Sequence, residues 1–412
     1  MATPVPQLDL TVTLADVEAA ARRIEGAVVR TPTLHSRILS ERTGANVWLK
    51  LENLQDTGAY KERGALNKLL LLPPELRARG VIAASAGNHS QALAWHASRL
   101  GVPATIVMPA STPAIKVSQT ESHGAEVILH GDRFDDAHAE ALRLSGERGL
   151  SFVHPFDDLE VIAGQGTVAL ELLADEPEVD TLIVPIGGGG LISGMGVVVK
   201  ALKPGLELIG VQAELYPGMY ARFSRQALPC AGDTLAEGIA VKAPGILTAG
   251  LVNRLVDDIL LVSERQIEIA VSLLIEAEKI VAEGAGAAGL AALLASPERF
   301  AGRTVGLVVT GGNIDTHLLA NVLLRNLARS GRMARLHISL QDRPGALAGV
   351  VQLFETHLVN IVEINHQRVF TSLPAKDAAI EVVCEARDAA QLERLTAALQ
   401  ANDYLTEPRP IE

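Results

Sequence analysis

Four consecutive glycines, Gly187–Gly190, are the feature of this sequence that most directly indicates chemistry. They follow an apolar run, Leu182–Ile186, that is typical of a buried strand, and a helical pattern begins after them. Because glycine contributes no side chain, such a turn leaves several backbone N–H groups bare near the positive end of a helix dipole. This combination predicts a phosphate-binding loop, and the alternative is a flexible loop without a ligand.

The residues around this loop narrow the kind of phosphate. A nucleoside triphosphate loop requires a lysine and a hydroxyl residue after its last glycine, but Leu191 and Ile192 stand there. The dinucleotide fingerprint also fails, because its third glycine would fall on Ile192 or Ser193. A smaller phosphate ligand such as pyridoxal phosphate fits these residues better. That cofactor requires a lysine able to form a Schiff base.

Lys61 is the candidate for this lysine. It lies at the start of an expected helix, within the segment Thr57–Gly64. Taken alone, it is more typical of a surface lysine paired with Glu62 or another neighbour. Its occurrence together with the glycine loop is what favours a chemical role.

Two other expected strands end in polar side chains. One ends in Ser85 and is followed by Asn88 and His89 at the start of a helix, which predicts an anion site suited to a substrate carboxylate. The alternative is that Ser85 only caps the helix. Another strand ends in Thr310, at the kind of position where open α/β sheets hold ligands.

Strands and helices must alternate along most of the chain to position these residues. Apolar strand-like runs alternate with helical patterns, which predicts a parallel sheet covered by helices on both faces. We expect a catalytic domain over 1–328, with a smaller subdomain over about 53–157 inserted in it. A linker over 329–332 then leads to an α+β module of ferredoxin-like order over 333–412, with one strand expected over 360–369.

Composition argues against several classes of partner. The chain has 412 residues and a net charge of −12, which disfavours nucleic acid or an anionic membrane as a main partner. The uncharged run over 181–199 is long enough to span a bilayer, but its glycines and Pro185 favour a buried strand, turn and helix. Cys230 and Cys384 are far apart, so no disulfide framework or zinc site is expected. We recognise no secretory signal and expect a cytoplasmic protein.

Seven motifs occur in a fixed order along the chain. They are the segment around Lys61, SAGNH at 85–89, PFDD at 155–158, GQG at 164–166, the four glycines, EGAGAA at 283–288 and TGGNID at 310–315. Together they resemble the threonine dehydratases, also called threonine ammonia-lyases, which are pyridoxal phosphate enzymes of fold type II. The resemblance implies an α/β fold of two open twisted sheets flanked by helices, like the tryptophan synthase β subunit. The C-terminal module resembles a regulatory ACT domain through its turn at 342–345.

The resemblance also implies a role for each candidate around the cofactor. Lys61 carries pyridoxal phosphate and then removes the α-proton of the substrate. The four glycines and the backbone of Leu191 bind the phosphate. Asn88 meets the ring hydroxyl, and Thr310 contacts the pyridine nitrogen.

The implied substrate is a small hydroxy amino acid. Ser85, Asn88 and His89 hold its carboxylate. Loss of water from L-threonine gives 2-oxobutanoate and ammonia, and L-serine gives pyruvate. The ACT-like module is expected to sense isoleucine or valine, and the chain is expected to form a dimer or tetramer.

Several alternatives stay open. Ala59 and Tyr60 stand where the family commonly has serine and phenylalanine, so an ammonia-lyase for L-serine or threo-3-hydroxyaspartate is the nearest alternative. A catalytically silent amino-acid sensor is the alternative of another class. Glu214 matches a metal ligand of the related serine racemase, but Tyr220 stands at the place of the partner aspartate, so we expect no metal.

Overall fold

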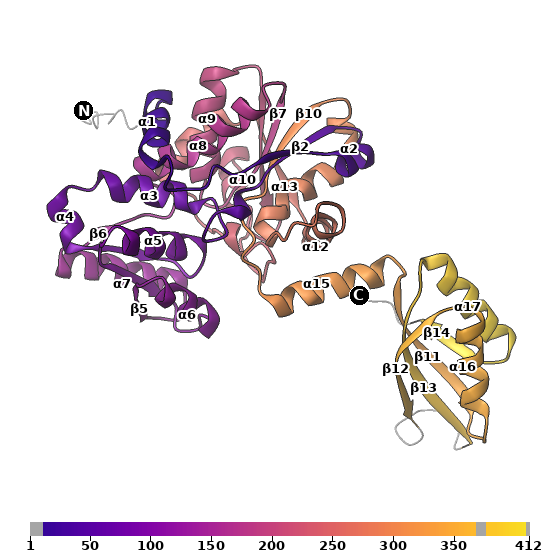
Figure 1. Ribbon diagram of the computed structural model, residues 1–412. Helices are drawn as coiled ribbons and strands as arrows, with labels where there is room; N and C mark the ends of the chain where they lie inside the picture. The colour runs from indigo at the N-terminus through magenta and orange to yellow at the C-terminus, as the bar shows by residue number, and fades with distance from the viewer. Residues whose placement is uncertain (1–10, 368–375, 409–412) are drawn as a thin grey trace. The chain divides into compact units, whose positions relative to one another are not determined.

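The structure is a computed structural model that describes residues 11–367 and 376–408 (Figure 1). Residues 1–10, where no secretory signal was recognised, lie outside these ranges, as does the end of the strand expected over 360–369. Among the described residues, no helix combines the length and the apolar character needed to cross a membrane.

The chain divides into two compact units, Met1–Ile314 and Asp315–Glu412. Helix α15 (Thr316–Arg329) therefore groups with the C-terminal unit. The boundary between the two units therefore precedes α15, whereas the linker predicted over 329–332 lies at the C-terminal end of this helix. The predicted domain boundaries stay predictions.

A six-stranded sheet forms the centre of the first unit (Figure 1). Its order is β1-β2-β10-β7-β8-β9, and all neighbours are parallel except β1 and β2. The strands are β1 (Thr33–Ser36), β2 (Asn46–Lys50), β7 (Thr181–Pro185), β8 (Glu207–Ala213), β9 (Asp258–Val262) and β10 (Thr304–Val308). Nearly all residues of β7, β8 and β10 are buried, as a parallel sheet covered on both faces requires.

Helices cover both faces of this sheet. Figure 1 shows α8 and α9 on one side of it and α12 and α13 on the other. The helical elements of this part of the chain are α1 (Leu14–Ile24), α2 (Arg37–Thr43), α8 (Leu159–Asp175), α9 (Gly190–Leu202), α10 (Gly218–Ser224), η2 (Glu237–Ile239), α11 (Ile246–Leu255), α12 (Glu264–Leu273), η3 (Leu274–Glu278), α13 (Gly284–Ala295) and α14 (Pro297–Phe300). Capping boxes begin α1 at Thr13 and α12 at Ser263.

A second, smaller sheet has the order β5-β4-β3-β6, and all of its strands are parallel. Its strands are β3 (Val81–Ala84), β4 (Ala104–Met108), β5 (Glu126–Leu129) and β6 (Ser151–Phe152). The helical elements around it are η1 (Glu52–Leu54), α3 (Lys61–Leu71), α4 (Pro74–Arg79), α5 (Asn88–Arg99), α6 (Ala114–Ser122) and α7 (Phe134–Arg148). Two open sheets flanked by helices confirm the predicted α/β architecture.

The C-terminal unit contains a four-stranded antiparallel sheet of order β12-β13-β11-β14. Its elements are β11 (Met333–Gln341), α16 (Ala346–Thr356), β12 (Asn360–Gln367), β13 (Asp377–Glu385), α17 (Ala389–Ala401) and β14 (Leu405–Pro408). This βαββαβ order is the ferredoxin-like α+β fold that the sequence predicts.

A buried ionic network anchors the start of α3. Arg63 is fully buried and donates hydrogen bonds to both carboxylate oxygens of Glu52 and of Glu171. Lys50 donates to the same Glu171 over 2.7 Å. Burial alone would raise the pKa of Glu52, but the charge and hydrogen bonds of Arg63 hold it below its ordinary value. Because Arg63 lies two residues after Lys61, this network also positions Lys61.

Candidate active site

The glycine loop joins β7 to α9, as predicted, and it is tightly packed against other segments. Gly189 has a φ of 96°, in the left-handed region that favours glycine. A Cβ atom on Gly188 would lie 2.3 Å from ring carbons of Phe156, and one on Gly187 would lie 3.2 Å from the carbonyl oxygen of Gly238. The loop therefore needs glycine for close packing as well as for bare backbone.

The loop also presents hydrogen-bond donors in one direction. The first N–H groups of a helix have no carbonyl partner within it. In α9 the N–H of Ser193 donates to the carbonyl of Gly189 over 3.0 Å, so the N–H groups from Gly190 to Ile192 precede the first helical bond. These donors, with the dipole of α9 behind them, are suited to an anion.

The segment after β6 holds the glycine loop in place. Nδ1 of His154 accepts a hydrogen bond from the N–H of Asp157 over 2.8 Å. Burial lowers the pKa of His154 to about 4, so the ring is neutral and remains an acceptor. The carboxylate of Asp157 accepts from the N–H of Thr248 over 3.0 Å, and the Thr248 hydroxyl donates to the carbonyl of Gly188 over 2.7 Å. This chain of contacts connects the two sheets around the loop.

Lys61 is the first residue of α3, as predicted, and its amine lies beside the same segment. Nζ donates a hydrogen bond to the carbonyl of Pro155 over 2.7 Å, next to the Phe156 ring that touches the glycine loop. Burial lowers the pKa of Lys61 to about 8, and the nearby Glu283 carboxylate opposes part of this shift. Much of the amine is therefore neutral near pH 8, as a nucleophile or a base must be.

Thr310 follows β10 and comes close to Lys61 through backbone pairing. The N–H of Tyr60 donates to the carbonyl of Thr310 over 3.1 Å, and Ala59 forms a bridge with Gly311. Thr310 itself is buried. The structure thus places Thr310 beside the start of α3, and its contact with a pyridine nitrogen stays a prediction.

Asn88 begins α5, and its amide is held from two sides. Oδ1 accepts a hydrogen bond from Nδ2 of Asn313, and Nδ2 donates to Oε1 of Glu283, both over 2.8 Å. The end of β3, the end of β10 and the segment before α13 therefore meet at this side chain.

The ring of His89 is bonded to the protein backbone, and the contact of His89 with a substrate carboxylate stays a prediction. Its buried ring has Nε2 3.1 Å from the carbonyl oxygen of Val153. Because a carbonyl only accepts, Nε2 carries the proton and Nδ1 is an acceptor. Burial lowers the pKa of His89 to about 3, and the positive charge of Lys61 adds to this. A neutral ring with a bare acceptor nitrogen cannot donate to a carboxylate, so the backbone N–H groups at the start of α5 are better candidates.

Ser85 does not cap α5, because the capping position is Gly87. The Ser85 Oγ instead accepts from the N–H of Gly87 over 3.3 Å, and its own hydroxyl proton is left for another acceptor. The contact between Ser85 and a substrate carboxylate stays a prediction.

Three further residues belong to this site, although the sequence alone indicates no role for them. Asp157 and Glu283 lie inside the PFDD and EGAGAA motifs, so their place in a motif was the feature of the sequence that could have indicated a role. Thr248 has no such signal, because a single threonine in an apolar helix is not distinguished by spacing or charge.

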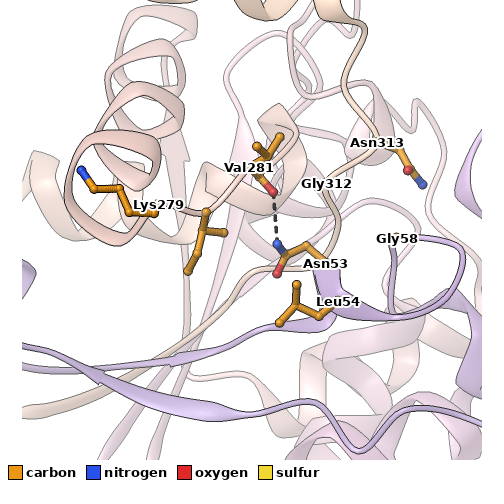
Figure 2. Close-up of a pocket in the computed structure, with 8 residues that line it drawn as sticks. Asn53, Leu54, Gly58, Lys279, Val281, Gly312 and Asn313 are labelled. Carbon is orange, nitrogen blue, oxygen red and sulfur yellow. Dashed lines mark hydrogen bonds between the residues drawn. The ribbon is translucent and has the colours of Figure 1, made fainter.

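A pocket of about 340 Å³ borders these residues (Figure 2). It is lined by Asn53, Leu54, Gly58, Lys279, Ile280, Val281, Gly312 and Asn313. Figure 2 shows Asn53 facing Val281, whose carbonyl accepts a hydrogen bond from Asn53 over 3.1 Å. Asn313 both lines this pocket and contacts Asn88, so the pocket reaches the edge of the candidate active site.

The residues present fit pyridoxal phosphate. The enclosed amine of Lys61 is able to form a Schiff base, and the glycine loop offers bare donors in a space that side chains would fill. The amide of Asn88 has a second N–H beyond the one donated to Glu283. Within the described ranges, no group of three or more His, Cys, Asp or Glu side chains is arranged to hold a metal ion.

Comparison with known proteins agrees with this geometry. Residues 24–311 match the family of pyridoxal-phosphate dependent enzymes. The L-threonine ammonia-lyase of Thermotoga maritima is 44% identical over 395 residues, which cover 95% of this chain and 98% of that protein.

Solved structures with the same fold include two that share 33% identity and a TM-score of 0.71 with this chain. The processed form of threonine deaminase isoform 2 from Solanum lycopersicum aligns over 75% of this chain and 86% of that chain. Maize serine racemase aligns over 77% of this chain and 98% of that chain. The chain therefore belongs to the family of pyridoxal-phosphate-dependent enzymes that includes the L-threonine ammonia-lyase of Thermotoga maritima.

Proposed function

We propose that the protein is an L-threonine ammonia-lyase that also acts on L-serine. It removes water from L-threonine and releases 2-oxobutanoate and ammonia, and L-serine gives pyruvate and ammonia. The observation that carries this proposal is the enclosed amine of Lys61 beside the glycine loop, in a chain 44% identical to an L-threonine ammonia-lyase over 95% of its length. A catalytically silent sensor has no need of a lysine whose pKa is about 8.

Pyridoxal phosphate, when bound, supplies an electron sink that weakens the bonds from Cα to hydrogen and from Cβ to oxygen. The bare N–H groups of Gly187–Gly190 and of Leu191 would hold its phosphate at the positive end of α9. The free N–H of Asn88 would serve its ring hydroxyl, and the neutral hydroxyl of Thr310 would serve its pyridine nitrogen.

Lys61 performs two tasks with one atom. Its neutral Nζ would hold the cofactor covalently, and the same nitrogen would accept the proton from Cα of the substrate. The carbonyl of Pro155 accepts an N–H of this amine over 2.7 Å, which holds the nitrogen in place and leaves its lone pair available. Burial supports both tasks because it lowers the pKa of Lys61 toward the working pH.

The start of α5 holds the substrate carboxylate. The backbone N–H groups of Asn88 and His89 lie at the positive end of this helix, and the hydroxyl of Ser85 precedes them. This anchor leaves the imidazole of His89 as a buried structural group, bonded to Val153.

An absorption spectrum of the purified protein before and after addition of L-threonine, with 2-oxobutanoate assayed in the same sample, tests the proposal. We expect a cofactor band that shifts on addition of threonine, together with product. Lys61→Ala should lose both, whereas Lys200→Ala, which removes a partly buried lysine paired with Asp257, should lose neither.

The same assay separates the alternatives. Strong preference for threo-3-hydroxyaspartate over threonine and serine would replace threonine as the substrate. Absence of a ketoacid from all three substrates would favour the amino-acid sensor.

The C-terminal unit adds a regulatory part to the proposal. Isoleucine or valine binds this unit and inhibits the enzyme, supported by its ferredoxin-like fold and by the turn at 342–345 that leads into α16. Removal of the residues after Arg332 should abolish inhibition by isoleucine, and an unchanged response would refute it. A dimer or tetramer and a cytoplasmic location complete the proposal, and light scattering and cell fractionation test them.

A further inference from the structure

Glu283 is an acidic residue whose side chain reaches the candidate active site and has no task in the proposed function. It precedes α13, but its side chain makes no capping bond to that helix. Oε1 instead accepts the hydrogen bond from Asn88. Two neighbouring glycines make room for this oxygen, because a Cβ on Gly311 would lie 2.7 Å from Oε1 and a Cβ on Gly238 would lie 3.1 Å from it.

A chain of hydrogen bonds with a defined direction leads to this carboxylate. Nδ2 of Asn313 donates to the carbonyl of Thr57 over 2.7 Å, and a carbonyl only accepts. The same amide group donates to Oδ1 of Asn88, so the Asn88 amide must turn its Nδ2 toward Glu283. The carboxylate of Glu283 is the acceptor at the end of this chain of hydrogen bonds. Because Asn313 donates to Asn88 and Glu283 accepts from it, the flipped orientation of the Asn88 amide is excluded.

We propose that Glu283 is the positioning residue of the cofactor ring: its carboxylate locks the Asn88 amide with the N–H end inward, so that the second N–H serves the ring hydroxyl. This inference rests on the cofactor pocket proposed above but not on the identity of the substrate. Without the carboxylate, the Asn88 amide keeps only the hydrogen bond that its Oδ1 accepts from Asn313. Its Nδ2 end is then free to rotate.

The charge of Glu283 matters as well as its hydrogen bond. The charged groups that face it are Lys61 from α3, Lys116 from α6 and Glu237 from η2, which is itself paired with Lys116. Burial raises the pKa of Glu283 to about 7, with Glu237 adding to the rise and the Asn88 hydrogen bond and the two lysines opposing it. Below that pH the carboxyl gains a proton, becomes a weaker acceptor for Asn88, and no longer offsets the positive charge of Lys61.

Binding of pyridoxal phosphate to the apo-protein tests this inference without relying on turnover. The dissociation constant is measured by absorbance titration for the wild type, Glu283→Ala, Glu283→Gln and Asn88→Ala, and for the double variant with alanine at both positions. Glu278→Ala serves as the matched control, because that carboxylate accepts from Ser36 instead of Asn88.

We expect Glu283→Ala to raise the dissociation constant on the order of 10-fold, the effect of losing a hydrogen bond to a charged acceptor. Glu283→Gln should stay within about 3-fold of the wild type, because its amide oxygen still accepts from Asn88. In the Asn88→Ala background, adding Glu283→Ala should change the constant by less than about 2-fold. Glu278→Ala should bind as the wild type does.

The pH dependence gives an independent readout. Wild-type affinity should show a pH-dependent step near 7 as Glu283 ionises, beside the step near 8 that comes from Lys61. Glu283→Gln, which cannot ionise, should lose the step near 7 and keep the one from Lys61. A purely structural role at the start of α13 would instead lower the unfolding temperature of the alanine and glutamine variants equally.

Three results would overturn the inference while leaving the cofactor pocket intact: wild-type affinity in Glu283→Ala, equal loss in the alanine and glutamine variants, or additive effects with Asn88→Ala. Failure of the wild-type apo-protein to bind pyridoxal phosphate would overturn the proposed cofactor pocket and this inference with it.

Discussion

Gly188 lies where one added methyl group should disturb the fold and the cofactor pocket together. In Gly188→Ala the new Cβ would lie 2.3 Å from ring carbons of Phe156. Favourable contacts between carbon atoms are about 3.5–4.0 Å long, so the ring or the loop must move by more than about 1 Å. The backbone of Gly188 is not in the left-handed region, so the expected cost comes from this overlap alone.

Overpacking of this kind costs about 1–3 kcal/mol. The same displacement moves the loop that supplies the phosphate donors, so the dissociation constant for pyridoxal phosphate should rise about 5- to 150-fold. Urea unfolding followed by circular dichroism measures the first effect on the apo-protein, and absorbance titration with the cofactor measures the second.

Two further variants separate the overlap from other causes. Phe156→Leu removes the ring, so adding it to Gly188→Ala should recover about 1 kcal/mol or more of the lost stability. Gly146→Ala is the matched control, because a Cβ there meets no atom within 4 Å and alanine favours the helix α7 in which it lies. Wild-type unfolding and cofactor binding in Gly188→Ala, or no recovery with Phe156→Leu, would refute the packing that we describe.

Three other perturbations address the lysine, its anchor and the glycine loop. The rate of cofactor capture by the apo-protein should rise with pH around a midpoint near 8, because only the neutral amine of Lys61 attacks. Stopped-flow absorbance measures this rate. A midpoint near the ordinary pKa of lysine would contradict the effect of burial. Arg63→Met should lower the free energy of unfolding at neutral pH by about 3–5 kcal/mol, because Glu52 stays buried without its partner. This loss should shrink as the pH falls and the Glu52 carboxyl gains a proton. A loss in urea unfolding that does not depend on pH would count against the ion pair. Thr248→Val removes the hydroxyl that donates to Gly188 and should weaken cofactor binding by about 1 kcal/mol, or roughly 5-fold in titration, whereas unchanged binding would show that this bond does not hold the loop.

Local patterns in the sequence predicted much of this protein. The glycine loop between a buried strand and a helix, Lys61 at the start of α3, and the ferredoxin-like order after 333 all follow from short stretches of chain. Such features depend on hydrogen-bonding and burial preferences of neighbouring residues, which the sequence displays directly. The motifs around them were specific enough to imply the cofactor and the family.

Local sequence patterns did not predict the orientation of individual side chains. His89 lies in a motif that implies carboxylate binding, yet its ring is buried against Val153. Glu283 approaches Asn88 across 195 positions of sequence separation, and no local pattern indicates that encounter. Which carboxylate reaches Asn88, and whether the His89 ring is buried, depend on neighbours supplied by distant segments.

The sequence by itself determined the types of element, the loop built from glycine and the lysine able to carry a cofactor. Only the tertiary structure decided that β3, β7 and β10 end around one place, that Phe156 closes on the glycine loop, and that burial brings the pKa of Lys61 to about 8. The physical reason is that backbone preferences act between close neighbours in the chain, whereas packing, desolvation and hydrogen-bond direction depend on whichever groups the completed fold brings into contact.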